Sequence, residues 1–346
     1  MPRIFIASAI VSLTILFGLT TALCALTPSP LQSKSRPDSK GSSAKDADAD
    51  SDEDIVTAIQ GVTFSNPVKN RWRVGVKIRG ASKSAKNFLI TIPVPVDWPE
   101  QTVQLQTEDF PPEVKSVTYR ELNSGVRQLV ATVPRIGAGQ LIEMTLVFKV
   151  ETSQVNAPTD PSQFVIPKRV PRELKDYIGV SPQISHRNTK IRNQVKKLVA
   201  DKETAWEKVE AIFDWVRENI EYRNEEPDDS LSVFRKKKGC SEDLAGLFVA
   251  MCRSAKIPAR MVWVEGAQYA EFYLQDSTDT GHWFPCNVAG RREFGSNAEP
   301  RIILQKGDNI KVPEKETRQK YCAEFVSGSG NVKPIVKFVR ELLPAD

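Results

Sequence analysis

Hydrophobic and polar residues alternate along much of residues 55–152, and this pattern excludes a helical fold for that part of the chain. A period of two places every second side chain on the same face of a β-strand. Prolines, glycines and asparagines separate the alternating stretches, as they do in antiparallel sandwiches. We therefore predict an immunoglobulin-like β-sandwich with a packing or recognition role. The clearest alternating positions are Trp72, Val74, Val76 and Ile78, then Ile142, Met144, Leu146, Phe148 and Val150.

Helical periodicity starts only beyond a proline-containing linker at residues 153–189. Between residues 206 and 220, apolar residues recur at steps of three and four, which indicates an amphipathic helix. Helices followed by antiparallel strands make an α+β arrangement. The sequence thus predicts an α+β domain over residues 190–305 and a C-terminal extension, 306–346, packed on that domain. A second helix is expected directly after Cys240, followed by strands at 260–265, 268–274, 282–288 and 301–304.

Residues 1–26 are predicted to direct export. Arg3 is followed by a run from Ile4 to Leu26 without any charged residue, which is typical of a Sec-type signal peptide. If the run is not cleaved, it is long enough to anchor the protein in a membrane. Residues 27–54 are rich in Ser, Pro, Lys and Asp, and they predict a disordered linker. We expect an exported protein of the periplasm or cell envelope, and the sequence leaves signal and anchor open.

Composition narrows the classes of function. Lysine and arginine number 48 against 43 acidic residues, for a net charge of +5, and no long basic run occurs, so nucleic-acid binding is not expected. The chain has two histidines, His186 and His282, which argues against a metal site built from clustered histidines. His186 lies in a polar stretch, where we expect it to be solvated or structural. Four cysteines, none of them at zinc-site spacing, stand outside the export segment: Cys240, Cys252, Cys286 and Cys322.

Cys240 is the candidate nucleophile. It follows Gly239 and immediately precedes a predicted helix, whose free amide groups stabilise a thiolate. The lysines at 236–238 would add to that effect, whereas Glu242 and Asp243 oppose it in part. Many acyl-transfer enzymes present a cysteine nucleophile in this way. On composition alone, a buried and inert cysteine at a helix start is an equal alternative.

The wider sequence around this cysteine resembles the transglutaminase-like superfamily. The resemblance rests on Gly-Cys-Ser-Glu-Asp-Leu at 239–244, Ile-Pro-Ala-Arg at 257–260, and two later segments at 269–274 and 281–285. It implies a fold of the papain-like cysteine-protease type, with the nucleophile heading a helix and His and Asp on two following strands. It also implies attack of the thiol on an amide carbonyl, transfer of the acyl group to an amine or to water, and a protein or peptide substrate. No metal or other cofactor is expected.

The sequence departs from this family at two positions. The family's His lies four residues before a strand Glu, and counting back from Glu271 gives Ala267. The family's Asp follows a Trp-x-Pro sequence, at the place where this chain has Asn287. If the strands form a hairpin in which Leu274 pairs with Thr280, Ala267 faces Asn287 and the two share one face.

Three interpretations remain open. His282 lies on the strand face opposite to Asn287, so a catalytic set of Cys240, His282 and Asn287 requires a bulge that shifts the register. Alternatively, Cys240 acts weakly or with Glu271 or Gln268 as its helper. In the third interpretation the domain is non-catalytic and binds a peptide or another envelope component. Side chains along these strands are candidates to line a substrate groove, although the strand spacing also suits the core: Trp263, Tyr269, Glu271 and Trp283.

Overall fold

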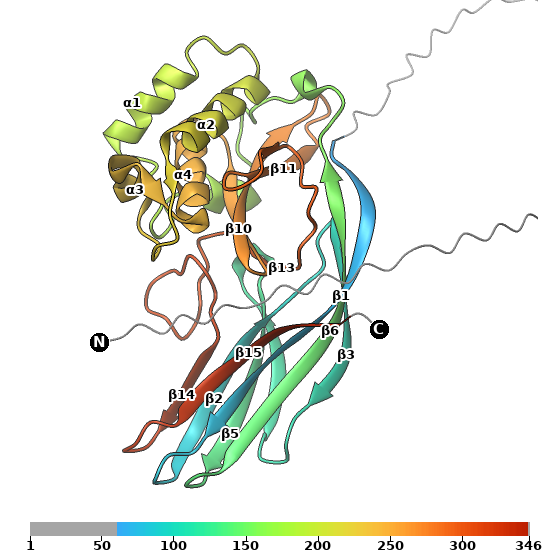
Figure 1. Ribbon diagram of the computed structural model, residues 1–346, viewed down its shortest axis with the longest axis vertical. Coiled ribbons are helices and arrows are strands. Elements are labelled where there is room, and N and C mark those ends of the chain that lie inside the picture. The colour runs from blue at the N-terminus through green and yellow to red at the C-terminus, as the bar shows by residue number, and fades with distance from the viewer. Residues whose placement is uncertain (1–60, 345–346) are drawn as a thin grey trace, which may run out of the picture. The chain divides into compact units, whose positions relative to one another are not determined.

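The computed structural model describes residues 61–344 (Figure 1), and the predicted export segment and the expected N-terminal linker lie outside the described residues. A sandwich of two four-stranded antiparallel sheets is ordered β15-β1-β6-β3 and β14-β2-β5-β4. The buried rows of the two sheets meet in one apolar core, which confirms the sandwich predicted from the alternation. The strands are β1 (Thr63–Arg79), β2 (Ala85–Val94), β3 (Gln101–Asp109), β4 (Ser116–Glu121), β5 (Arg127–Ile136), β6 (Leu141–Asn156), β14 (Phe325–Ser329) and β15 (Ile335–Leu343).

The last two strands of the chain belong to this sandwich. β14 pairs with β2 and β15 pairs with β1, so each extends one sheet at its edge. The prediction that all of residues 306–346 pack on the α+β domain is therefore wrong for these strands. The physical reason is that a sheet edge presents unpaired backbone groups, which a returning strand satisfies. The beginning of the extension does contact the α+β domain, through ion pairs of Lys306 and Asp308.

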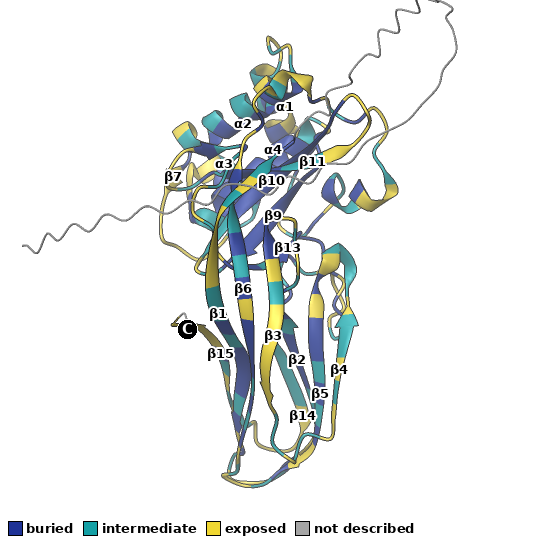
Figure 2. Ribbon diagram, turned by 90° about the vertical axis from the view of Figure 1, so that its right-hand side faces the viewer, coloured by how far each residue is buried: buried dark blue, intermediate teal, exposed yellow. Residues whose placement is uncertain are grey.

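Four helices and a five-stranded antiparallel sheet, ordered β12-β11-β10-β9-β13, form the α+β domain. Helix α4 packs on β9 and β10 and also contacts the other three helices, so most of its residues are buried (Figure 2). No helix within residues 61–344 is long and apolar enough to cross a membrane. The elements are α1 (Thr189–Leu198), α2 (Ala205–Asn219), α3 (Ser230–Lys236), α4 (Ser241–Ser254), β9 (Ala259–Val264), β10 (Ala267–Gln275), β11 (Gly281–Asn287), β12 (Glu293–Phe294), β13 (Ile303–Lys306) and the short parallel pair β7 (Glu221–Tyr222) and β8 (Lys238–Gly239).

Local sequence sets where the helices begin. Thr204 and Glu207 form a reciprocal capping box at the start of α2. The side chain of Asn188 caps α1, and that of Asp229 accepts two backbone N–H groups at the start of α3. Each of these residues satisfies helix amides that would otherwise lack a partner.

The β10–β11 hairpin has a register different from the predicted one. Leu274 pairs with His282, and not with Thr280. The reason is the turn at residues 276–280, where the Asp276 carboxylate accepts two backbone N–H groups and fixes the loop. The shift amounts to two residues, so each side chain keeps the face that the sequence predicts for it.

Candidate functional site

Cys240 occupies the N-cap position of α4. Its backbone is extended, its backbone N–H donates to Asp243 Oδ2 at 3.0 Å, and the backbone N–H of Asp243 points at its sulfur. Gly239 makes this approach feasible, because a Cβ at that position would lie 2.6 Å from the Asp243 Cβ. The same carboxylate accepts the backbone N–H of Asp228 at 2.8 Å, so the loop before α3 and the start of α4 are fixed together.

The environment of the Cys240 thiol favours its neutral form. The residue is only 9% exposed, and burial raises the pKa of the Cys240 thiol above its ordinary value. Backbone N–H groups of Asp243 and Glu242 act in the opposite direction, but the Asp243 carboxylate adds to the rise. A neutral thiol is a poor nucleophile.

The three lysines before Cys240 are engaged elsewhere. Lys236 pairs with Asp228, and Lys238 pairs with Glu225. The ammonium group of Lys237 lies 4.3 Å from each of two ring centroids, those of Trp215 and Phe234. Their position in the sequence predicts that these lysines help a thiolate, but in the structure each of them has another partner.

Neither histidine of the chain lies near Cys240. The start of α4 contacts β10 at Gln268, whose Oε1 accepts the hydroxyl of Ser241 at 2.8 Å. His282 pairs with Leu274, which lies six residues further along β10 and therefore about 20 Å away. There its Nε2 lies 2.8 Å from the Asp276 carboxylate. The structure thus does not bring His282 to the candidate nucleophile.

His186 lies at the other end of α4. Its backbone carbonyl accepts the hydroxyl of Ser254, the last residue of the helix, about 20 Å from Cys240 along the axis. Burial, with a contribution from the charge of Arg253, lowers the pKa of His186. This histidine is buried and structural, in line with one of the two expectations for it.

Three of the four predicted substrate-lining side chains have structural partners instead. Glu271 is buried opposite Pro285 and forms ion pairs with Arg260 and Lys306. The ring of Trp283 lies 3.9 Å from the Arg260 guanidinium. The indole N–H of Trp263 donates to a backbone carbonyl, that of Gly307, at 3.0 Å.

A cavity of about 400 Å³ lies beside the start of α4. Both replaced positions, Ala267 and Asn287, line it together with Ser241, while Cys240 itself does not. Tyr269 is the one predicted substrate-lining residue on its wall, and burial raises the pKa of this phenol. The remaining lining residues are Tyr222, Val264, Gly266, Gln268, Pro285, Ala289, Gly290, Arg291, Glu293, Ser296, Asn297, Glu299 and Arg301.

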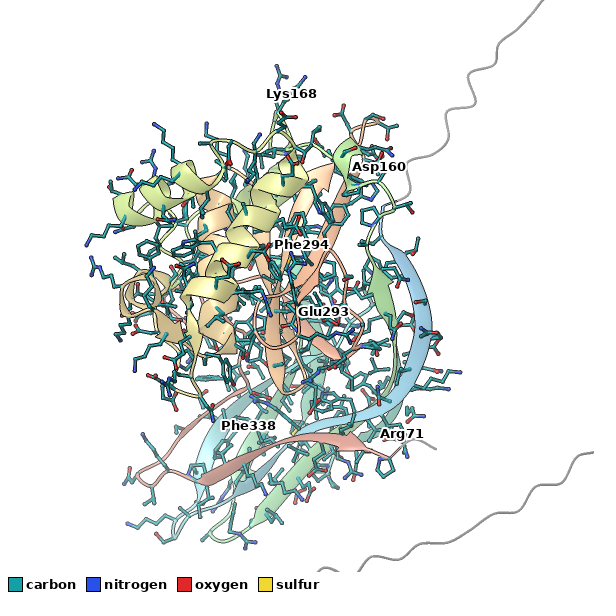
Figure 3. The ribbon with its side chains drawn as sticks, turned by 45° about the horizontal axis from the view of Figure 1, so that its top comes forward. Arg71, Asp160, Lys168, Glu293, Phe294 and Phe338 are labelled. Carbon is teal, nitrogen blue, oxygen red and sulfur yellow. The ribbon has the colours of Figure 1, made fainter. Side chains whose placement is uncertain are left out.

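Glu293 is a buried carboxylate of this cavity that the sequence motifs do not indicate. It pairs with Asn287 across β11 and β12, so the two side chains share one face, and it is 6% exposed. Figure 3 labels Glu293 beside Phe294, the other residue of β12. Its Oε1 accepts the backbone N–H of Ala298 at 3.2 Å, and within residues 61–344 no cation pairs with it. The turn around Gly290 is the sequence signal that would have placed Glu293 opposite Asn287.

A second hollow of about 490 Å³ shares Tyr222, Ala289 and Gly290 with this cavity. Arg217 holds the loop that both hollows share, because its guanidinium donates to backbone carbonyls of residues 287–291. We call the two neighbouring hollows together the cleft. In the described part of the chain, no group of three or more His, Cys, Asp or Glu is arranged to hold a metal ion.

Part of the chain is similar to a known protein family. The sequence model of the transglutaminase-like superfamily matches residues 192–288. A crystal structure from Cytophaga hutchinsonii, provisionally named a cysteine protease, is 16% identical and superposes with a TM-score of 0.55 over 82% of this chain and 94% of that one. This likeness shows a shared fold.

A second crystal structure, from Parabacteroides distasonis and provisionally named a protease, is 14% identical with a TM-score of 0.26. It covers 64% of this chain and 47% of its own, and the low score supports no conclusion about the fold. No curated protein matches the chain in sequence.

Proposed function

Because residues 192–288 match the sequence model of the transglutaminase-like superfamily, we propose that the protein binds a polypeptide segment in the cleft of this domain without acyl-transfer chemistry. The observation that carries the proposal is the state of Cys240. Its thiol is buried against a carboxylate, and both histidines of the chain lie far from it. Thiol attack on an amide needs a thiolate or an adjacent base such as histidine; burial and the Asp243 carboxylate disfavour the thiolate, and neither histidine is adjacent.

The shape and lining of the cleft support a polymeric ligand. Two neighbouring hollows with many polar side chains suit an extended chain, whose backbone amides and carbonyls need partners along its length. Since neither Ala267 nor Asn287 carries a titratable group, the cleft supplies an amide for hydrogen bonding at Asn287 and no general base at either position.

Acyl transfer dependent on Cys240 is the competing function. It is favoured by one observation, namely that two backbone N–H groups, those of Glu242 and Asp243, act on the sulfur and lower the pKa of the thiol in part. In that case the cleft would hold the substrate while Cys240 forms a thioester with it and releases an amine.

Alkylation of the full chain with iodoacetamide separates the two functions. We expect slow modification of Cys240 at pH 7 and faster modification as the pH rises, measured by peptide mass spectrometry. The Cys240→Ser variant should bind the peptides tested below as wild type does, and wild type should neither cleave nor cross-link casein. Rapid alkylation near neutral pH, together with casein turnover that Cys240→Ala abolishes, would establish the enzyme instead.

We also propose that the protein is exported to the periplasm or cell envelope, with residues 1–26 acting as signal peptide or membrane anchor. The support is the uncharged run that begins at Ile4. Cell fractionation combined with N-terminal sequencing tests both parts: cleavage near residue 26 indicates a signal, and an intact N-terminus in the membrane fraction indicates an anchor. Recovery of the intact chain in the cytoplasm would contradict export.

A further inference from the structure

We propose that Glu293 determines the specificity of the cleft by binding a cationic side chain, lysine or arginine, of the polypeptide. The inference rests on the proposed function, since it names what the cleft selects. It concerns a residue that takes no part in thiol chemistry, because Glu293 lies on β12 and pairs with Asn287.

The other buried carboxylates of the described residues each have a cation or several hydrogen-bond donors as partners. Within residues 61–344, Asp308, Glu271 and Glu100 each bind a buried arginine or lysine. Asp243 accepts two backbone N–H groups, and Asp276 binds His282 and several donors of its own turn. These five carboxylates and Glu293 are the buried ones in this part of the chain.

Glu293 differs from the other five because a single backbone N–H, that of Ala298, donates to it. A buried carboxylate without a cation or several donors carries a large desolvation cost. A ligand that brings an ammonium or guanidinium group to the carboxylate removes that cost, and a neutral ligand of the same size does not.

The position of Glu293 also suits the binding of a cationic side chain. Glu293 lines the cavity of about 400 Å³, and neighbouring walls carry the amide side chains of Asn287 and Asn297. This space is sufficient for a lysine or arginine side chain, with neutral amides around the methylene groups and one acid for the charge.

The two arginines at the rim of the cavity, Arg291 and Arg301, repel a bound cation only weakly. Arg301 is paired with Glu299 at 3.7 Å, and both are exposed. Arg291 is exposed as well, so solvent and salt screen its repulsion of a cation much more than they screen the attraction of a buried acid. Arg291 further favours an acidic residue next to the cationic one in the same segment.

The test uses the full chain and acetylated, amidated pentapeptides Gly-Ser-X-Ser-Gly, in which X is lysine, arginine, norleucine or glutamate, with binding measured by calorimetry. We expect the lysine or arginine peptide to bind wild type at least about tenfold more tightly than the norleucine peptide. This ratio should fall to about one in Glu293→Gln and persist in Glu299→Gln, a matched change at an exposed carboxylate of the same cavity. Without peptide, Glu293→Gln should melt no lower than wild type, because the change removes an unpaired buried charge.

Each other outcome is decisive. Equal binding of lysine and norleucine peptides to wild type, or a preference for charge that survives in Glu293→Gln, would overturn the inference and leave the proposed function standing. A large drop in the melting temperature of Glu293→Gln would make Glu293 a structural residue. If free n-butylamine displaces the lysine peptide at equal concentration, the site binds small amines, and the inference that it selects a side chain of a polypeptide is wrong. If none of the four peptides binds wild type, the proposed function itself fails.

Discussion

Two regions on one face of the five-stranded sheet of the α+β domain differ in how completely their buried charged side chains are paired. In the middle of that face, Arg260, Glu271, Lys306 and Glu100 form a buried and balanced group, in which the Lys306 ammonium lies 2.5 Å from each of the two carboxylates. At the cavity, Glu293 is equally buried and has one backbone donor. A fully paired network stabilises a unique packing, whereas an incompletely paired group indicates that something outside the chain completes it.

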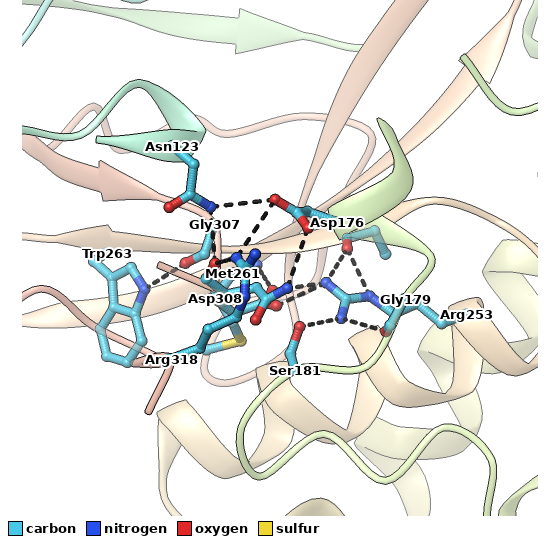
Figure 4. A network of polar contacts seen from close by, with 12 residues as sticks. Asn123, Asp176, Gly179, Ser181, Arg253, Met261, Trp263, Gly307, Asp308 and Arg318 are labelled. Carbon is cyan, nitrogen blue, oxygen red and sulfur yellow. Dashed lines mark hydrogen bonds and ion pairs between the residues drawn. The ribbon is translucent and has the colours of Figure 1, made fainter. Parts of the chain in front are cut away.

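The same contrast extends to α4. Its C-terminal part carries Arg253, which is fully buried and donates to Asp308, to the Ser181 hydroxyl and to backbone carbonyls (Figure 4). At the N-terminal end, Cys240 is held by one carboxylate that disfavours its ionisation. The helix is therefore rigidly anchored at one end and carries a weakly activated group at the other.

The largest expected effect is at the paired network. Replacing Lys306 by methionine keeps the volume but leaves Glu100 and Glu271 with too little positive charge, so the free energy of unfolding should fall by about 3–5 kcal/mol. Because Lys306 bonds Glu100 of the sandwich and Glu271 of the α+β domain, urea denaturation followed by fluorescence should show the loss. The control is Lys77→Met, which breaks an exposed ion pair with Glu143 and should change stability by less than about 1 kcal/mol. Similar losses in the two variants would remove the distinction between the paired network and ordinary surface pairs.

The architecture was largely predictable because it depends on repeating patterns. Alternation along β1 and β6 predicts the sandwich, and the three- and four-residue steps between 206 and 220 predict α2. The place of β14 and β15 was not predictable in this way, since nothing in a strand's own alternation says which distant edge it will join. The predicted hairpin register was wrong for a similar reason, because the register depends on how the Asp276 side chain closes a turn.

The candidate site was predictable only in outline. Sequence motifs place Cys240 at a helix start and bring Ala267 and Asn287 to one cavity, as the structure shows. The depth at which the thiol is buried and the pairing of the three lysines depend on side chains distant in sequence. Glu293 could not be predicted, because a single glutamate after a turn belongs to no sequence motif. It stands out only in the structure, where its buried carboxylate has a single backbone donor.

The next effect in size concerns the cleft. Because Ala267 and Asn287 line the same cavity as Ser241, the double variant Ala267→His with Asn287→Asp should place an imidazole and a carboxylate in the cavity next to the residue that follows Cys240. An imidazolium close to a thiol favours the thiolate, so alkylation of Cys240 at pH 7 should speed up on the order of tenfold. Asn287→Asp alone is the control and should not raise the rate. An unchanged alkylation rate in the folded double variant would show that charged groups in this cavity do not affect the ionisation of the Cys240 thiol.

A smaller effect is expected from acid on the paired network. Burial alone would raise the pKa of Glu271, but the charges of Arg260 and Lys306 overcome burial and hold the pKa below its ordinary value. A lowered pKa in the folded state means that the ionised carboxylate stabilises the protein above about pH 4.5, and that this contribution is lost as the pH falls through the folded-state pKa. The difference in unfolding free energy between wild type and Glu271→Gln should therefore shrink from pH 6 to pH 3. A difference that stays constant over this range would show that the charge of Glu271 contributes nothing.

The smallest expected effect returns to the start of α4. In Asp243→Asn the amide oxygen can still accept one backbone N–H, but the negative charge that raises the pKa of Cys240 is gone. Alkylation of Cys240 at pH 7 should become faster, by less than about tenfold because burial remains the larger cause. Glu242→Gln is the matched control: Glu242 acts on the sulfur through its backbone N–H, which the variant keeps, and its carboxylate pairs with Lys320 at 3.0 Å. If Asp243→Asn reacts no faster than Glu242→Gln, the carboxylate is not what restrains the thiol, and the contrast between the cleft and the paired network would then rest on Glu293 alone.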